Sequence, residues 1–171
     1  MVAELLIDFI LAFIRILAAI ILSASALYTG ISMLNRLTSG IDEWKLIKKG
    51  NVAVGLFYTT AMFSLMIFVA PRISEFIVYI QDVLPIEITI LNLIILFVNY
   101  VLSLILGTLI IFLTIHIIDR LTSDLDEMAE LERGNVAVAL IMSIVLVSVV
   151  LASSVPAESV FSIIKSLEAA L

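Results

Sequence analysis

Residues 36–56 read RLTSGIDEWKLIKKGNVAVGL, and residues 120–140 read RLTSDLDEMAELERGNVAVAL. These two stretches decide how the chain folds, because one repeats the other. At a constant offset of 84 residues, 12 of the 21 aligned positions are identical. A match of this length at one offset indicates an internal duplication. The chain is therefore expected to contain two copies of one structural unit.

Long apolar runs flank both stretches. A bilayer core about 30 Å thick needs roughly 20 apolar residues in a helix. Four runs lack any charged side chain: Ile16–Leu34, Val52–Phe68, Ile88–Ile115 and Val136–Val155. We therefore predict an all-α integral membrane protein with four transmembrane helices. Because each copy of the repeat holds two of them, the two helical hairpins enter the membrane in the same direction and are parallel-related.

The composition agrees with a membrane protein and argues against several other classes. Apolar residues make up 63% of the chain and charged residues 14%, and the mean hydropathy is +1.28. The chain has no cysteine, so disulfides, a thiolate nucleophile and cysteine-ligated metals are excluded. The net charge of -6 argues against nucleic acid as a partner, because a phosphate backbone requires a basic surface.

The expected organisation is one compact membrane domain, with a first two-span repeat at residues 1–84 and a second at 85–171. Six of the nine basic residues lie in loops 35–50 and 119–134. The positive-inside rule then places both loops in the cytoplasm and both termini outside, in the cell membrane. The N-terminus has no basic n-region, so the first helix is not expected to be a cleaved signal peptide.

The repeated Gly-Asn pair predicts a joint between two helices. Gly50 and Gly134 suit a helix C-terminus that requires positive φ. Asn51 and Asn135 suit the N-cap of the span that follows. This repeat joint needs no ligand to explain it.

A short amphipathic helix is expected before each joint. Ser39 and Asp42 have the Ser-x-x-acid spacing of a capping box, as do their equivalents in the second copy. Apolar residues then recur every three positions, with Trp44 and Met128 as equivalent anchors at the membrane interface. These interface helices would form the cytoplasmic docking surface for a protein partner.

Prolines follow the second and fourth apolar runs. Pro71 and Pro156 are expected to end these spans, because proline lacks an amide hydrogen and clashes with the preceding turn. The residues up to Ile80 and Leu167 would then form short amphipathic helices on the outer surface.

The repeated unit consists of Leu-Thr, a short charged helix, and Gly-Asn-Val-Ala-Val at the start of a span. Its occurrence twice in a four-span chain resembles the domain-of-unknown-function 350 family of small prokaryotic membrane proteins. The resemblance covers most of the chain and implies an integral membrane location with duplicated hairpins. It implies no substrate.

Polar side chains also occur within or beside the first and third apolar segments. Asp8 and Arg15 lie seven residues apart on one helix face, and Asn92 and Asn99 occupy the equivalent positions of the second repeat. One hypothesis is a polar path, with Arg15 and Asn99 at its constriction. The other is that these groups are interfacial or make interhelical contacts. The sequence leaves both open.

His116 is the single histidine and is interpreted as an interfacial or packing residue, with a proton relay as the alternative. The loop Asp119–Arg133 carries a net charge of -4, and Arg36–Lys49 carries +2. Such runs are typical of solvated helix faces. They could also attract a divalent cation or pair with each other within or between chains.

Known enzyme motifs are absent: the sequence has no nucleophile elbow, His-Glu-x-x-His, phosphate-binding loop or dinucleotide fingerprint. We therefore expect no catalysis, cofactor or metal. The favoured function is a structural or interaction component of the lipid bilayer that forms a homo-oligomer. The alternative is a small ion channel or transporter with a polar path near the repeat or oligomer axis.

Overall fold

The computed structural model describes residues 2–37, 42–83, 90–122 and 125–168, which form six α-helices. Four helices are long: α1 (Val2–Leu37), α3 (Val52–Val83), α4 (Ile90–Leu121) and α6 (Val136–Glu168). Two are short: α2 (Glu43–Lys48) and α5 (Glu127–Glu132). The long helices are apolar enough to cross a membrane, so the predicted four-span, all-α architecture is confirmed.

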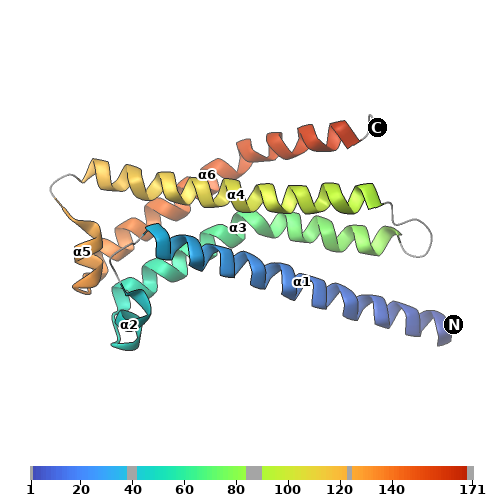
Figure 1. Ribbon diagram of the computed structural model, residues 1–171, viewed down its shortest axis with the longest axis horizontal. Coiled ribbons are helices and arrows are strands. Elements are labelled where there is room, and N and C mark those ends of the chain that lie inside the picture. Colours follow the sequence, from blue (N-terminus) through green and yellow to red (C-terminus); the bar gives the residue numbers. More distant parts are fainter. Residues whose placement is uncertain (1, 38–41, 84–89, 123–124, 169–171) are drawn as a thin grey trace.

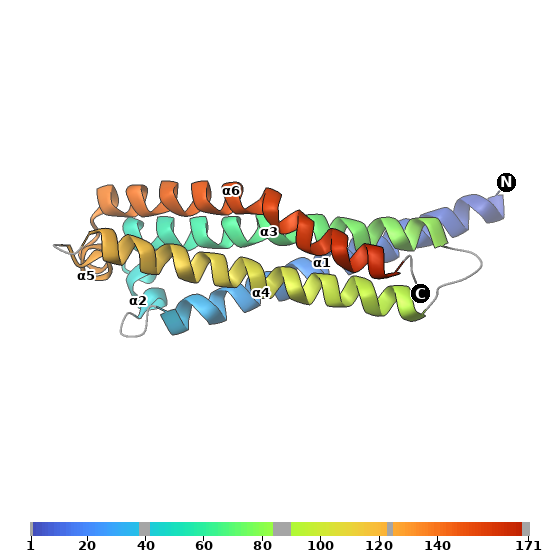
Figure 2. The same cartoon turned by 90° about the horizontal axis from the view of Figure 1, so that it is seen from above.

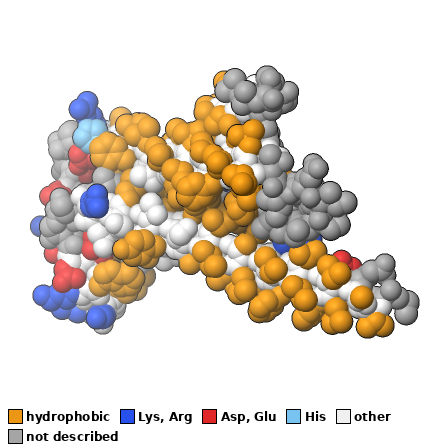
Figure 3. All heavy atoms as spheres, turned by 45° about the vertical axis from the view of Figure 1, so that its right-hand side comes forward, with side chains coloured by type: hydrophobic (Ala, Val, Ile, Leu, Met, Phe, Trp, Pro, Cys, Tyr) orange, Lys and Arg blue, Asp and Glu red, His pale blue; other side chains and the backbone are white. Residues whose placement is uncertain are grey.

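The long helices form two hairpins, α1 with α3 and α4 with α6 (Figures 1 and 2). Helices α2 and α5 lie together at one end of the bundle, called the joint end below. Most charged side chains visible in Figure 3 gather there, whereas hydrophobic side chains cover most of the remaining face. This distribution suits a bundle whose long sides contact lipid.

The centre of the bundle is the pair α3 and α6. Helix α3 packs against α1, α4 and α6, whereas the long neighbours of α6 are α3 and α4. Gly107 of α4 faces α3 at close range. A Cβ atom built there would be 3.0 Å from Leu65 Cδ1 and 3.3 Å from Phe68 Cβ. The missing side chain therefore allows the two backbones to approach, as is common in membrane bundles.

The prediction that proline ends two of the spans is wrong. Helix α3 continues past Pro71 to Val83, and α6 continues past Pro156 to Glu168. Each proline removes one backbone hydrogen bond and bends a helix, but neighbouring helices can support the continuation. Figure 1 shows both helices changing direction along their length. The sequence predicts separate amphipathic helices after the two prolines. In the structure these residues are instead the C-terminal parts of α3 and α6.

The short helices form as predicted, but with a different cap. Asp42 is itself the N-cap of α2, and its carboxylate accepts a hydrogen bond from the Lys45 amide at 3.0 Å. Asp126 likewise accepts from the Ala129 amide at 2.9 Å. The two aspartates therefore occupy the N-cap, which is the first position of a capping box, whereas the sequence predicts them at the fourth position. The predicted caps Ser39 and Ser123 lie outside the described residues.

The short helices bury both apolar and charged side chains. Leu131, three residues after Met128, is 2% exposed, and Met128 is half-buried against the core. Trp44 is 51% exposed, and its role as an anchor at the membrane interface stays a prediction. The equivalent glutamates Glu43 and Glu127, which the apolar pattern does not include, are 5% and 3% exposed.

Substitution of Gly107 by leucine should destabilise the bundle, because the new side chain meets Leu65 and Phe68. The expected cost is about 1–3 kcal/mol from overpacking. Gly55→Leu is the matched control, since no atom lies within 4 Å of a Cβ built there. Unfolding by titration with a denaturing detergent would measure both; equal costs would contradict the close contact of α3 and α4.

Candidate functional site

The most unusual polar group in the described bundle is the guanidinium of Arg72. Arg72 lies on α3 directly after Pro71 and is only 3% exposed. It follows Val52 by about 20 residues, which is roughly 30 Å of helix. Counted from the joint end, this is about the full thickness of a bilayer core. A buried charge at such a position requires close partners.

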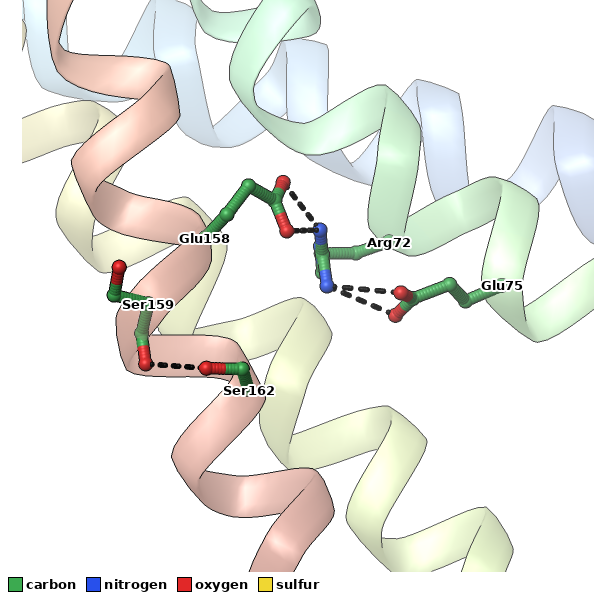
Figure 4. A network of polar contacts seen from close by, with 5 residues as sticks. All are labelled: Arg72, Glu75, Glu158, Ser159 and Ser162. Atoms are coloured by element: carbon green, nitrogen blue, oxygen red, sulfur yellow. Dashed lines mark hydrogen bonds and ion pairs between the residues drawn. The ribbon is translucent and has the colours of Figure 1, made fainter.

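Two carboxylates supply these partners, as Figure 4 shows. Nη1 of Arg72 donates to both carboxylate oxygens of Glu75, one turn along α3, at 3.0 Å. Nη2 donates to both oxygens of Glu158 on α6, at 2.5 and 2.6 Å. The guanidinium also lies over the Phe161 ring, with Cζ 4.3 Å from the ring centroid. We call Arg72, Glu75, Glu158 and Phe161 the arginine cluster.

The arginine cluster joins the two repeats. Charge-assisted hydrogen bonds from one Nη to each carboxylate hold the guanidinium between α3 and α6, and the aromatic face adds a cation–π contact. The two carboxylates give the cluster a formal charge of -1. Glu158 is 55% exposed on its side chain, so one edge of the cluster reaches the bundle surface. An arginine stays protonated, so this arrangement suits holding helices together rather than acid–base chemistry.

The sequence pattern alone did not indicate this cluster. A signal was available in the two proline segments, which read Pro-Arg-Ile-Ser-Glu-Phe and Pro-Ala-Glu-Ser-Val-Phe. Each copy carries a charge close after its proline, and the two charges are opposite. Because equivalent helices of a duplicated bundle can pack side by side, this opposition could have indicated a contact.

The four residues of the hypothetical polar path lie in different environments. Asn99 is 1% exposed and its Oδ1 has no hydrogen-bond partner. Arg15 and Asn92 are half-buried, and Asp8 is exposed. The Nε atom of Arg15 is buried and also without a hydrogen-bond partner. No hydrogen bond or ion pair found among the described residues joins any two of these four.

The register of α1 against α4 separates Arg15 from Asn99. The Tyr100 hydroxyl donates to the Leu22 carbonyl at 2.8 Å and shares a hydrogen bond with the Ser25 hydroxyl at 2.5 Å. Arg15 precedes Leu22 by about seven residues, or roughly 10 Å of helix. Asn99 lies beside Tyr100, so these two polar groups do not meet at one level of the bundle.

The two Gly-Asn joints lie close together at the joint end. Gly50 and Gly134 both have φ of 84°, the left-handed conformation that glycine adopts without strain. Asn51 Oδ1 accepts from the Val54 amide at 3.1 Å, and Asn135 Oδ1 accepts from Val138 at 3.3 Å. Both asparagines therefore cap the long helix that follows.

The amide groups of the two asparagines have different partners. Asn51 Nδ2 crosses to the other repeat and donates to the carbonyls of Leu131 and Glu132, both at 2.9 Å. It therefore caps the start of α3 and the end of α5 together. Asn135 Nδ2 instead donates to the Glu130 carboxylate of its own repeat at 2.7 Å.

The pKa of Glu130 is lowered, first by the hydrogen bond from Asn135 and then by that from Arg133. A lowered pKa in the folded state stabilises the protein above the ordinary value of 4.5. That contribution is lost as the pH falls through the lowered pKa. The joint of the second repeat is therefore the acid-sensitive one of the two.

The fold and these contacts define a class: a multi-pass membrane protein built from a duplicated two-helix hairpin. Comparison with known families agrees. The chain belongs to the family described as Domain of Unknown Function (DUF350), which matches residues 6–99 and again 88–167. The two overlapping matches fit a duplicated unit. No curated protein and no solved structure matches the chain.

Replacing Arg72 by methionine should be strongly destabilising, because Glu158 and Glu75 would lose their shared cation. Losing the hydrogen bonds to charged partners costs about 1.5–3 kcal/mol; the remaining Glu158 side chain is 55% exposed, so it is not left as a buried charge. Arg133→Met is the control, since Arg133 pairs with Glu130 but is 73% exposed, and such pairs contribute about 1 kcal/mol or less. Detergent-titration unfolding of both variants would measure the difference. A similar loss in the free energy of unfolding for both variants would show that Arg72 does not hold the two repeats together.

Asn51→Asp should destabilise the protein more than Asn135→Asp. Both variants keep a side-chain oxygen for the N-cap, but Asn51→Asp removes two donors and places a carboxylate beside two carbonyls. Each lost hydrogen bond costs about 0.5–1.5 kcal/mol, so the expected loss is at least 1–3 kcal/mol. The unfolding midpoints above pH 6 test this, and a larger loss for Asn135→Asp would contradict it.

Proposed function

We propose that this protein is a non-enzymatic membrane component that assembles with copies of itself through α1 and α6. The observation that carries this proposal is the uneven coverage of the two repeats. Helix α3 is covered by three long helices, whereas its equivalent α6 is covered by two. On α3, the additional neighbour is α4 of the other repeat, and the helix equivalent to α4 in the first repeat is α1. The neighbour that α6 lacks therefore corresponds to α1.

Equivalent residues on α3 and α6 differ in exposure accordingly. Ser64 and Phe68 are buried on α3, with exposures of 0% and 5%. Their equivalents at the 84-residue offset, Ser148 and Ala152, are exposed. Together with Ile141 and Ile144, they form an exposed, mostly apolar stripe on α6. The stripe is therefore the surface that corresponds to covered positions on α3.

The N-terminal half of α1 shows the complementary difference. Tyr100 is 4% exposed on α4, whereas its equivalent Ile16 on α1 is 57% exposed. Gly107 of α4 lies close to Phe68 of α3, and the equivalents of these two residues are Ser23 and Ala152. Both equivalents are small, which suits close packing of two helices in a membrane.

The length of α1 supports a protein cover rather than lipid alone. Even a tilt of about 40° places only about 26 residues within a 30 Å core. Counted from Arg36, the residues before about position 10 then lie beyond the hydrocarbon. These include Val2, Leu5, Leu6, Ile7 and Phe9, each more than half exposed. A second copy would shield this apolar end from water.

The contact of α1 with α6 of a neighbouring copy would be head-to-tail. Such an interface uses two different surfaces on each chain and forms a ring when the rotation between copies closes.

A channel or transporter lined by Arg15, Asn92, Asn99 and Asp8 is the less supported function, because the register separates Arg15 from Asn99. In the favoured assembly Arg15 lies near the junction of two chains.

The joint end would remain available to a protein partner. Trp44 is exposed, and Lys45 and Lys48 beside it are also exposed. Met128, its equivalent in the second repeat, is half-buried and less available. We therefore assign the docking surface to α2 rather than equally to both short helices, with the joint end facing the cytoplasm by the positive-inside rule.

Disulfide cross-linking between two differently tagged chains tests the assembly, because the chain has no cysteine of its own. One chain carries Ser23→Cys and the other carries Ala152→Cys. In the corresponding contact of α4 with α3, the two Cβ positions are 3.3 Å apart, close to the range that a disulfide bridges. Oxidation in native membranes should give a mixed dimer.

Ile21→Cys replaces Ser23→Cys in the control, because Ile21 is 66% exposed but lies on another face of α1. The yield of mixed dimer should fall several-fold with this variant. If folded chains give no dimer, or equal yields from both variants, lipid covers this face and the proposed assembly is wrong.

A further inference from the structure

A cavity of about 170 Å³ lies at the joint end, outside the arginine cluster and the proposed assembly surfaces. Helices α4, α5 and α6 line it. The lining residues are Phe112, Ile115, His116, Asp119, Glu127, Met128 and Met142. A cavity of about 150 Å³ is large enough for a molecule such as benzene. The available space therefore suits a ligand of roughly five to seven non-hydrogen atoms.

One face of α4 forms the mouth of the cavity. Phe112, His116 and Asp119 follow one another at helical spacing, and all three are exposed. The Phe112 and His116 rings are stacked, with centroids 6.1 Å apart and an interplanar angle of 7°. The mouth thus presents an aromatic surface next to a carboxylate.

A buried carboxylate lies deeper in the cavity. Glu127 is 3% exposed, and its Oε1 atom has no hydrogen-bond partner. Met142, on the α6 side, is 1% exposed. A buried carboxylate oxygen without a partner is unfavourable, so a cation or hydrogen-bond donor beside Oε1 would be favoured.

The first repeat does not have the same group. Its equivalent glutamate, Glu43, is 5% exposed and has an interaction partner. Five of the seven lining positions also differ between the repeats: Tyr28, Ser32, Asn35, Trp44 and Tyr58 correspond to Phe112, His116, Asp119, Met128 and Met142. The second repeat therefore gains a carboxylate and an imidazole and loses two phenols and an indole. These changes are local to the cavity and make it more negative.

The chemistry of the lining points to an organic cation. Two carboxylates attract positive charge, and aromatic rings stabilise an ammonium group within about 6 Å. The two methionines offer a polarizable apolar wall. Among the described residues no group of three or more His, Asp or Glu side chains is placed to hold a metal ion. We propose that this cavity binds a primary ammonium ion on a short apolar chain, with Glu127 and Asp119 as its anionic contacts.

Thermal unfolding of the full chain in lipid nanodiscs, with n-butylammonium chloride as the probe, tests this site. The unfolding temperature should rise with probe concentration above the level given by sodium chloride at equal ionic strength. The uncharged analogue 1-butanol should give no such rise. An equal rise with sodium chloride would reduce the effect to charge screening and overturn the proposal, as would an equal rise with 1-butanol.

Three variants test whether n-butylammonium binds in this cavity. Glu127→Gln should raise the dissociation constant of the probe at least tenfold, and Asp119→Asn several-fold. Glu43→Gln, the matched change in the first repeat, should leave it unchanged. Because Asp119 is exposed, Asp119→Asn keeps the test decisive even if Glu127→Gln does not fold. Unchanged affinity in Asp119→Asn, or equal weakening by Glu43→Gln, would show that the probe binds elsewhere.

Discussion

A guanidinium removed from water needs its charge neutralised and its donors paired, and the relation between the two halves of this bundle depends on that requirement. Carboxylates from two helices, Glu75 of its own helix and Glu158 of the other repeat, neutralise the charge of Arg72 and pair both of its Nη donors, whereas Nε has no hydrogen-bond partner. The contact lies just beyond the prolines, where α3 and α6 each lose a backbone hydrogen bond. Side-chain contacts between the helices thus support the bundle at the level where the backbone is weakest.

At the opposite end, Asn51 joins the repeats by neutral hydrogen bonds, capping α3 and α5 together. The two attachments are about 30 Å apart along α3, so they fix both ends of the central pair. Between them the contacts are apolar and tight, with glycine where α4 faces α3 at close range. This division is physically reasonable, because polar contacts set the register whereas apolar packing alone permits sliding.

The sequence predicts the local features of this structure well. Apolar run lengths locate the spans, and the Gly-Asn pair locates the joints, because a left-handed glycine and a capping asparagine act within a few residues. Features that depend on neighbouring helices were not predictable in this way. Pro71 and Pro156 looked like helix ends because the propensity of proline is local, whereas the support for a bent helix is not.

The candidate site shows the same limit. A spacing of seven residues shows that two side chains share a helix face, but it does not show how far one helix is shifted along another. The sequence therefore placed Arg15 and Asn99 at one constriction of a polar path. Their separation follows from Tyr100 contacting Leu22, a pairing between residues 78 positions apart. The contact of Arg72 with Glu158 spans 86 positions. The burial of Glu127 likewise depends on how α5 lies against the bundle, and the three-residue apolar pattern does not include this residue.

The opposite charges of Arg72 and Glu158 have a consequence for the origin of such a chain. When Pro71 and Pro156 are aligned, Ala157 takes the place of Arg72 and Ile73 takes the place of Glu158. Two copies of the first hairpin would therefore lack the carboxylate from the other repeat, and two copies of the second hairpin would lack the cation. Only two unlike hairpins can make this contact. The fused gene can thereby encode which half belongs with which, and exchange of halves between chains is penalised unless it restores the same unlike pair.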